Sequence, residues 1–333
     1  FDDAGRTPQA GEVVVEVAGC GLCHTDLGFL DGQVKTRVDL PLVLGHEISG
    51  TVVEAGDGAE QWLGKDVLVP AVIPCGECGL CLSGRGNVCA SQKMPGNDLD
   101  GGFGTHVTVP TMGLSVVENL PEGYDLADFS VVADAVTTPL QAVRRAEVTE
   151  GDFVVVVGAG GVGAYAVQIA AASGGTVIAV DIDDSRLELL LQHGATGTVN
   201  ARDLSARDVR NQVREHAQRV GAPREGWKIF ECSGTPSGQE TAYGLLGPAA
   251  TLAVVGFTME KVTIRLSNLM AFDATAFGSW GCPPERYAEA IELVTSGKVK
   301  LLPFTRKVPM RDIAAAIEQA HQGGDARRTI LIP

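Results

Sequence analysis

One stretch constrains the fold more than any other. Residues 151–181 read "GDFVVVVGAGGVGAYAVQIAAASGGTVIAVD" and join two apolar runs through a glycine-rich turn. A continuous apolar run is typical of a strand that is buried on both faces of a parallel sheet, and the turn has the pattern G-x-G-x-x-G. We predict a β-α-β unit, which comprises a strand at 154–157, the glycines Gly158, Gly160 and Gly163, a helix at 164–172 and a second strand at 177–180.

This unit has the chemistry of a dinucleotide site. Gly160 lets the backbone approach a pyrophosphate, and the N-terminus of the following helix favours its negative charge. Asp181 closes the second strand 23 positions after Gly158, where it would accept hydrogen bonds from the adenosine ribose. Asp181 and Asp183 would repel a 2'-phosphate, so we expect NAD rather than NADP. Arg186 is the nearby residue that softens this preference.

Four of the eight cysteines fall within fifteen residues, "CGECGLCLSGRGNVC", with the spacing C-x2-C-x2-C-x7-C. Since no secretory signal opens the sequence, we expect a reducing cytoplasm, where thiolates bind metal rather than form disulfides. Four thiolates close a tetrahedral zinc site and leave no position for substrate. A finger that reads nucleic acid is disfavoured, because Arg85 and Lys93 are the only cations nearby. The predicted ligands of this structural zinc are Cys75, Cys78, Cys81 and Cys89.

A second metal position is indicated by ligand types that lie far apart in the sequence. Cys23 in "GCGLCHTD" offers a thiolate, His46 in "GHE" an imidazole, and Glu47 can act behind them. A catalytic zinc takes three protein ligands and keeps one open position. The third candidate is Asp134, an acid within the apolar run "VVADAV", where an unpaired carboxylate would be costly to bury. Two alternatives remain open: a redox pair of Cys20 and Cys23, and a purely structural role for His46.

Composition and patterning indicate two domains. The chain has 333 residues, of which 45% are hydrophobic, and a net charge of -15, which opposes binding to nucleic acids or anionic membranes and favours a small-molecule partner. After the glycine-rich unit, helical and strand patterns alternate as in a doubly wound sheet, whereas short alternating segments before it predict an antiparallel domain. The remaining predicted strands are 12–18, 48–54, 65–70, 104–110, 228–232, 251–256, 274–279 and 329–332, and the remaining predicted helices are 209–220, 239–246 and 284–296.

Taken together, the motifs "GLCHTD", "GHE", the four-cysteine lobe, "GAGGVG" with Asp181, and "RRTILIP" make the chain resemble the zinc-containing medium-chain alcohol dehydrogenases over nearly its whole length. This resemblance implies an α/β protein with a Rossmann doubly wound parallel sheet at 137–279, which binds NAD. It also implies a GroES-like, mainly antiparallel β catalytic domain at 1–136 and 280–333, with the structural zinc lobe at 75–89. Two zinc ions per chain and assembly into a homodimer or homotetramer are further expectations.

The resemblance also implies roles for single residues. Asp134 stands where many family members have a cysteine, and Thr25 would receive the alcohol proton. Members with a long proton relay have a histidine five residues after the first zinc ligand, whereas this chain has Gly28. The implied catalytic zinc ligands are Cys23, His46 and Asp134, with Glu47 behind them. The implied cofactor contacts are His24, Thr138 against the nicotinamide, Gly158, Gly160, Gly161, Val162, Gly163, Asp181, Arg186, Val255, and Arg328 on the pyrophosphate.

A narrower resemblance concerns "SGRGNVCASQKMPGN", "VVADAVTTPLQA" and "LMAFDATAFGSWGCPPE". These stretches are similar to family members of anaerobic benzoyl-CoA breakdown, which implies oxidation of an allylic ring alcohol carried as an acyl-CoA thioester. The phosphates of such a substrate would need cations, for which the candidates are Lys93, Arg144, Arg145 and Lys261. Two other functions remain open: an enone reductase that acts on the C=C bond, and a non-catalytic protein that binds NAD or zinc.

Overall fold

A computed structural model describes residues 7–323 and 327–333 of the chain, which divides into two compact units. The first unit comprises Phe1–Thr137, Gly281–Gly297 and Leu301–Pro333, and the second comprises Thr138–Trp280 and Lys298–Lys300. Within the described part of the chain, no helix is long and apolar enough to cross a membrane.

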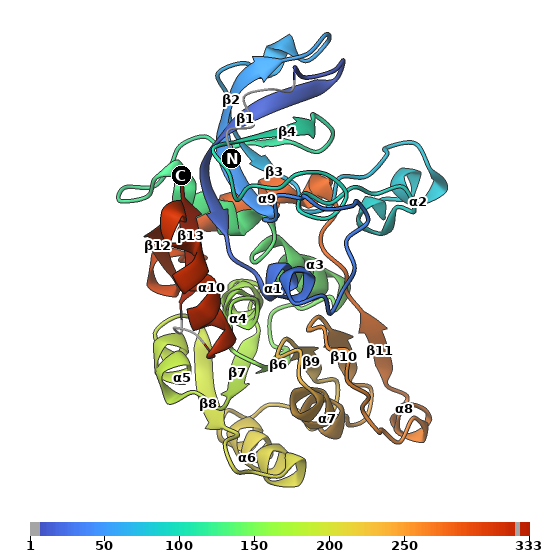
Figure 1. Ribbon diagram of the computed structural model, residues 1–333. Helices are drawn as coiled ribbons and strands as arrows, with labels where there is room; N and C mark the ends of the chain where they lie inside the picture. The colour runs from blue at the N-terminus through green and yellow to red at the C-terminus, as the bar shows by residue number, and fades with distance from the viewer. Residues whose placement is uncertain (1–6, 324–326) are drawn as a thin grey trace. The chain divides into compact units, whose positions relative to one another are not determined.

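The second unit is built on a six-stranded sheet, in which all neighbouring strands run parallel in the order β11-β10-β9-β6-β7-β8 (Figure 1). The order reverses between β6 and β9, and all five residues of β6 are buried. This confirms the predicted doubly wound α/β fold. The strands are β6 (Phe153–Val157), β7 (Thr176–Asp181), β8 (Ala195–Asn200), β9 (Lys228–Glu231), β10 (Thr251–Val254) and β11 (Thr275–Gly278).

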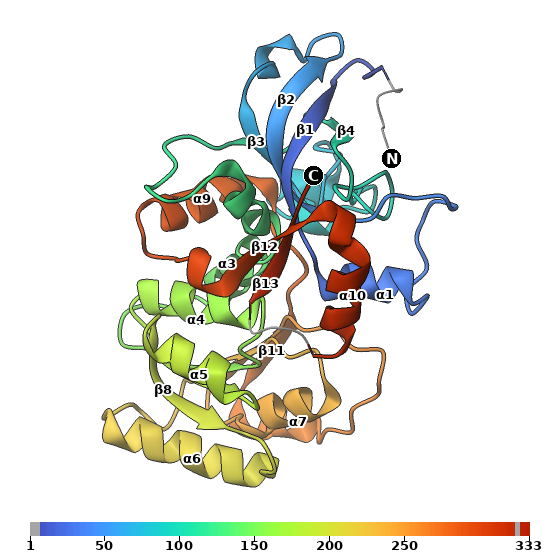
Figure 2. The same ribbon diagram turned by 60° about the vertical axis from the view of Figure 1, so that its left-hand side comes forward.

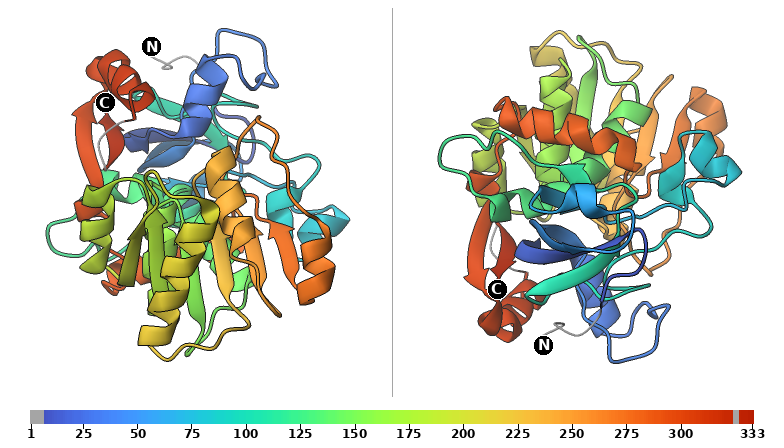
Figure 3. Two further views of the ribbon diagram at one scale, coloured as in Figure 1. Left: turned by 90° about the horizontal axis from the view of Figure 1, so that it is seen from below. Right: turned by 90° about the horizontal axis from the view of Figure 1, so that it is seen from above.

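Helices cover both faces of this sheet (Figure 3). The chain adds β7 and β8 on one side of β6 and then β9, β10 and β11 on the other. Because each crossover is right-handed, the helices of the two halves lie on opposite faces. Two of them begin earlier than the apolar pattern predicts, because an N-cap residue starts each helix before the apolar pattern begins. Ser205 accepts a hydrogen bond from the backbone of Asp208, and Thr235 precedes a proline at the first helical position. The helices are α3 (Thr137–Arg145), α4 (Gly163–Ala172), α5 (Asp184–Leu191), α6 (Ala206–Arg219), α7 (Pro236–Gly244) and α8 (Ser267–Phe272).

The first unit contains a seven-stranded sheet in the order β12-β13-β1-β2-β3-β5, with β4 also paired to β1 (Figure 2). All pairs are antiparallel except β12 with β13. The C-terminal strand pairs with β1, where Cys20 lies opposite Leu331. The strands are β1 (Glu12–Gly21), β2 (Glu47–Ala55), β3 (Asp66–Val69), β4 (His106–Pro110), β5 (Ser115–Val116), β12 (Thr305–Pro309) and β13 (Arg328–Ile332).

Short helices connect and cover this sheet. Neither α1 nor α10 was predicted, and they share a small apolar cluster formed by Leu22, Leu27, Ala316 and Leu331. The α-helices are α1 (His24–Leu30), α2 (Gly79–Leu82), α9 (Tyr287–Thr295) and α10 (Ile313–His321). The 3-10 helices are η1 (Glu60–Trp62), η2 (Gly86–Val88), η3 (Leu126–Ala133), η4 (Pro284–Arg286), η5 (Leu302–Phe304) and η6 (Met310–Asp312).

Candidate active site

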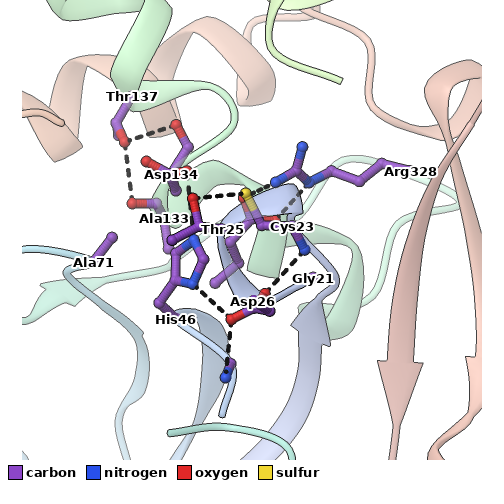
Figure 4. Close-up of polar contacts among 12 residues, drawn as sticks. Gly21, Cys23, Thr25, Asp26, His46, Ala71, Ala133, Asp134, Thr137 and Arg328 are labelled. Carbon is purple, nitrogen blue, oxygen red and sulfur yellow. Dashed lines mark hydrogen bonds and ion pairs between the residues drawn. The ribbon is translucent and has the colours of Figure 1, made fainter. Parts of the chain in front are cut away.

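Separate segments of the first unit bring four candidate metal-binding side chains together. Figure 4 shows three of them, Cys23, His46 and Asp134. Cys23 directly precedes α1, His46 directly precedes β2, Glu47 begins β2, and Asp134 follows η3. One ligand atom from each lies within 4.8 Å of those of the other three, and His46 Nε2 is 3.7 Å from Asp134 Oδ2. The structure therefore assembles the group of residues that sequence reasoning proposed from distant motifs.

Asp26 orients two members of this group, although sequence reasoning gave it no role. Its Oδ1 lies 3.0 Å from His46 Nδ1 and also accepts from the backbone N–H of Gly45 at 3.2 Å. Its Oδ2 accepts from the backbone N–H of Cys23 at 3.0 Å. Because Nδ1 donates to Asp26, Nε2 is left for a metal. The missed signal was an acid three residues after Cys23, at the start of a helix.

The charges around His46 favour a cation. Burial lowers the pKa of His46, but the negative charge of Asp26 and hydrogen bonds with Asp134 and Asp26 outweigh burial and raise it well above its usual value. The acidic neighbours of His46 thus favour positive charge at this position. A metal ion would supply that charge.

The donor set fits a catalytic zinc. A thiolate, an imidazole nitrogen and a carboxylate oxygen are all ligands that zinc accepts, and three of them leave one tetrahedral position open. His46 is 1% exposed and Cys23 is 9% exposed, whereas the Asp134 side chain is 17% exposed. Thr25 Oγ1 lies 3.6 Å from Cys23 Sγ on the exposed side of this group.

Glu47 is held by Arg328. Nε of Arg328 donates to Glu47 Oε2 at 2.7 Å, and its Nη2 donates to Oε1, so both carboxylate oxygens are engaged. Burial raises the pKa of Glu47 to about 7, against the lowering influence of the guanidinium. The ion pair with Arg328 favours the predicted place of Glu47 behind the three ligands, which stays a prediction. The pyrophosphate role of Arg328 stays a prediction, since its described hydrogen bonds run to Glu47.

The four remaining candidate ligands form a closed cluster. Neighbouring Sγ atoms of Cys75, Cys78, Cys81 and Cys89 are 3.5 to 3.8 Å apart. Four sulfurs at about 2.3 Å from one zinc ion would be about 3.8 Å from one another in a tetrahedron. A disulfide would require about 2.05 Å, and all four thiols are free. The cluster therefore has the dimensions of a structural zinc site.

The cluster also needs a cation for electrostatic reasons. Hydrogen bonds from the backbone and from the thiol of Cys81 lower the pKa of Cys78 to about 6. Burial and the neighbouring Cys78 raise the pKa of Cys81 to about 12. One thiolate thus forms easily and opposes the next, so four thiolates can coexist only around a metal.

In the second unit, the glycines of the turn divide into two kinds. A Cβ on Gly158 would lie 2.5 Å from the backbone of Ser233, and one on Gly163 would lie 1.7 Å from the carbonyl oxygen of Gly158, so packing alone requires both glycines. At Gly160, by contrast, the single neighbour found within 4 Å among the described residues is Arg186 Nη1, at 3.8 Å. The fold does not demand a glycine there, whereas the approach of a pyrophosphate would.

Asp181 lies at the end of β7, as the ribose-binding prediction requires. Its Oδ2 accepts from the backbone of Ala159 at 2.6 Å, and its Oδ1 accepts from those of Ile182 and Asp183 at 2.8 and 3.0 Å. Arg186 Nη1 lies 3.9 Å from Oδ1. The other predicted cofactor residues are spread along the chain: His24 begins α1, Thr138 lies in α3, Gly161 and Val162 precede α4, and Val255 follows β10.

Cys20 belongs to the core of the first unit rather than to a redox pair. It is fully buried against the β-sheet cluster that includes Val15 and Ile48, and its thiol is free. Burial raises its pKa well above the usual value. Cys232 and Cys282 are likewise free thiols whose pKa is raised by burial.

Comparisons with known proteins agree with this arrangement. The model of the alcohol dehydrogenase GroES-like domain matches residues 9–121, and that of zinc-binding dehydrogenases matches residues 161–296. The 2-dehydro-3-deoxy-L-galactonate 5-dehydrogenase of Pseudoalteromonas atlantica is 30% identical over 93% of this chain and 88% of its own length. Galactitol-1-phosphate dehydrogenase from Escherichia coli is 28% identical, with a TM-score of 0.87 over 99% of this chain and 94% of its own. A dehydrogenase from E. coli CFT073 in complex with NADH is 26% identical, with a TM-score of 0.85 over 99% and 94%.

Proposed function

Since the chain belongs to the zinc-binding medium-chain alcohol dehydrogenase family, we propose that it oxidises a secondary alcohol to a ketone and transfers the hydride to NAD. The observation that carries this proposal is the convergence of Cys23, His46 and Asp134 on one point beside Thr25. When bound, zinc supplies a Lewis acid that makes an alcohol easier to deprotonate, and NAD supplies the hydride acceptor.

The protein's own side chains position and deprotonate the alcohol. Thr25 presents a hydroxyl on the exposed side of the ligand group, where it can accept the alcohol proton. Asp26 fixes the ring of His46 through Nδ1, and Arg328 holds the buried carboxylate of Glu47 behind the ligands. Because Gly28 offers no side chain for a relay, we propose that the proton passes from Thr25 directly to solvent.

The cofactor contacts remain part of the proposal. The open space over Gly160 and the carboxylate of Asp181 support binding of the pyrophosphate and the adenosine ribose. Asp181 and Asp183 would oppose a 2'-phosphate, so NAD is the proposed cofactor. Arg186, 3.9 Å from Asp181, partly offsets that negative charge, and weaker use of NADP would therefore be consistent with the site.

The finer substrate assignment rests on the sequence motifs alone. We propose a cyclic allylic alcohol, with 6-hydroxycyclohex-1-ene-1-carbonyl-CoA as the specific candidate. Of the four cations considered for the CoA phosphates, Arg144 donates to Ser173, and Arg145 stacks on Phe277 and donates to Gly278. Lys93 and Lys261 are both exposed and remain the two candidates. Two of the relatives named above carry the names of sugar-derived substrates, so such polyols are the second candidate class.

The formation of NADH, followed by its absorbance, tests both levels of the proposal. The panel should contain the cyclic hydroxyacyl-CoA thioester, galactitol 1-phosphate and simple secondary alcohols. Turnover of galactitol 1-phosphate or simple alcohols, but not of the thioester, would exclude the acyl-CoA substrate and would still support an alcohol dehydrogenase. Formation of a saturated ketone from the enone and NADH would instead identify a C=C reductase.

A matched pair of variants tests the role of Thr25. Thr25→Val keeps the shape of the side chain but removes the hydroxyl, so kcat should fall by about 100-fold or more. Thr25→Ser retains the hydroxyl and should keep most of the activity. Equal activity of the two variants would exclude Thr25 as the proton acceptor.

We also propose that the enzyme is cytoplasmic, where its thiols stay reduced. Among the described residues, β11 pairs only with β10, and we propose that two copies associate through its other edge in a homodimer, or in a tetramer built from such dimers. Residues of this edge strand are largely exposed, and an unpaired edge invites a partner strand. Large apolar side chains are exposed in the same part of the sequence, namely Phe257, Met259, Leu266, Met270 and Trp280. The molar mass in solution tests the assembly, because a monomer at micromolar concentration would exclude it.

A further inference from the structure

A single buried hydroxyl joins the segment that carries the third metal ligand to the segment that leads into the four-cysteine cluster. We infer that Tyr287, the first residue of α9, is a positioning residue for Asp134. This inference rests on the proposed zinc site at Cys23, His46 and Asp134. Tyr287 is 1% exposed and lies 154 positions from Ala133 in the sequence, so no local motif reveals the contact.

Both hydrogen-bonding functions of this hydroxyl are used on the backbone. Tyr287 Oη donates to the carbonyl oxygen of Ala133 at 2.5 Å, and it accepts from the backbone N–H of Ala71 at 3.1 Å. Burial raises the pKa of Tyr287, so the hydroxyl keeps its proton and stays a donor. A buried tyrosine that bridges two backbone segments fixes the distance between them.

The direction of Asp134 depends on how η3 ends. The last carbonyls of a helix lack partners within the helix, and η3 ends at Ala133, one residue before Asp134. Asp134 has φ -139° and ψ -55°, so the chain leaves the helical path at this residue. The Ala133 carbonyl is satisfied by Tyr287 and by Thr137 Oγ1, the latter at 3.1 Å. These two hydroxyls therefore stabilise the exit from η3 that leaves the Asp134 carboxylate 3.7 Å from His46 Nε2.

The second contact reaches toward the other metal centre. Ala71 follows β3 and precedes Ile73, which pairs with Lys93 on the far side of the four-cysteine segment. Cys75 begins that segment two residues after Ile73. The Tyr287 hydroxyl thus connects the backbone next to Asp134 with the backbone that leads to Cys75. Because it bonds the residue adjacent to Asp134 but none of the four cysteines, its removal should weaken metal binding at the catalytic site selectively.

The test is metal release from Tyr287→Phe, which keeps the ring and removes only the hydroxyl. The fully loaded protein is mixed with a coloured chelator, and release is followed over time. The two sites can be assigned after cobalt replaces zinc, because four thiolates and one thiolate give charge-transfer bands of different intensity. Tyr243→Phe is the matched control, since its buried hydroxyl also donates to a backbone carbonyl, that of Arg265 at 2.7 Å, but lies in the second unit.

We expect the metal at Cys23, His46 and Asp134 to leave about 10-fold faster from Tyr287→Phe, as for other groups that orient a metal ligand. Release from the four-cysteine site, and both rates in Tyr243→Phe, should match the wild type. Thr137→Val, which removes the other hydroxyl on the same carbonyl, should accelerate release from the same site.

Four results would overturn this role of Tyr287. Unchanged release from the catalytic site would show that the hydroxyl does not position Asp134. Equal acceleration at both sites would show a general loss of stability, as would the same change in Tyr243→Phe. A wild-type protein that holds metal only at the four cysteines would overturn the proposed zinc centre itself and this inference with it.

Discussion

Replacement of Gly160 by alanine should separate cofactor binding from folding. A Cβ at this position meets only Arg186 Nη1, at 3.8 Å, among the described residues, and the backbone there does not adopt a positive φ. The folded chain therefore accommodates the methyl group, and the unfolded chain loses conformational freedom. We expect the free energy of unfolding to stay constant or to rise by about 0.4 to 1 kcal/mol.

The same methyl group would occupy the space that a pyrophosphate needs. The backbone of a dinucleotide turn approaches the phosphates closely at this glycine, so alanine forces the ligand away from the N–H groups that bind it. We expect the affinity for NADH to fall at least about tenfold, which corresponds to about 1.4 kcal/mol. Stability and affinity should thus change independently.

Gly163→Ala is the matched comparison within the same turn. Its Cβ would lie 1.7 Å from the carbonyl oxygen of Gly158 and 3.3 Å from Cys232 Cβ, so the start of α4 must move away from the turn. Overpacking of this kind costs about 1 to 3 kcal/mol. This variant should lose stability even without cofactor.

Denaturant unfolding of the cofactor-free protein and titration of NADH by its fluorescence measure the two quantities. The reasoning would be refuted if Gly160→Ala lost as much stability as Gly163→Ala, because the space over Gly160 would then be needed by the fold. It would be refuted equally if Gly160→Ala bound NADH as tightly as the wild type, since no phosphate would then approach that glycine.

Two further predictions concern the metal centres. Asp26→Asn keeps the size of the side chain but removes the charge that orients the imidazole. In chelator competition, the affinity for the catalytic zinc should therefore fall about 10-fold to 100-fold, while the four-cysteine site keeps its affinity. Parallel losses of affinity at both sites would contradict this prediction. In zinc-free protein, the pKa of Cys78 is lowered to about 6, mainly by the backbone of Cys81, so its thiolate forms as the pH rises through 6. Alkylation of Cys78 should therefore be fast at pH 7 and slow below pH 6, and a midpoint near pH 9 would exclude the shift.

Features that depend on local spacing were readable from the sequence. The turn from Gly158 to Gly163 and the strands on either side of it obey a pattern confined to thirty residues, and the parallel sheet follows from it. The four cysteines lie so close together that any compact path must bring their sulfurs into contact, as the distances of 3.5 to 3.8 Å show. In both cases, the chain itself limits the number of possible neighbours.

Features that depend on distant partners were not readable in the same way. Arg328 and Glu47 are 281 positions apart, and only the pairing of β13 with β1 and of β1 with β2 brings them together. Tyr287 looks like an ordinary core aromatic until its hydroxyl is seen between two backbone segments. The helix α10, "IAAAIEQAH", was not predicted. Its apolar side packs against Leu27 of α1 and Leu331 of β13, partners that lie far away in the sequence.

The charges of the catalytic group compensate one another. Asp134 and Glu47 place two carboxyl groups within 4.8 Å of the imidazole of His46, and Asp26 contacts the other ring nitrogen. The positive charge of Arg328 compensates the negative charge of the Glu47 carboxylate. A protonated His46 compensates Asp26 and Asp134 in the same way, so the zinc-free site can fold without unpaired buried charges. A metal ion that enters must then displace the proton from His46 Nε2. Zinc binding and proton release are consequently one equilibrium at this site, and acid opposes zinc there by protonating the same nitrogen that binds it.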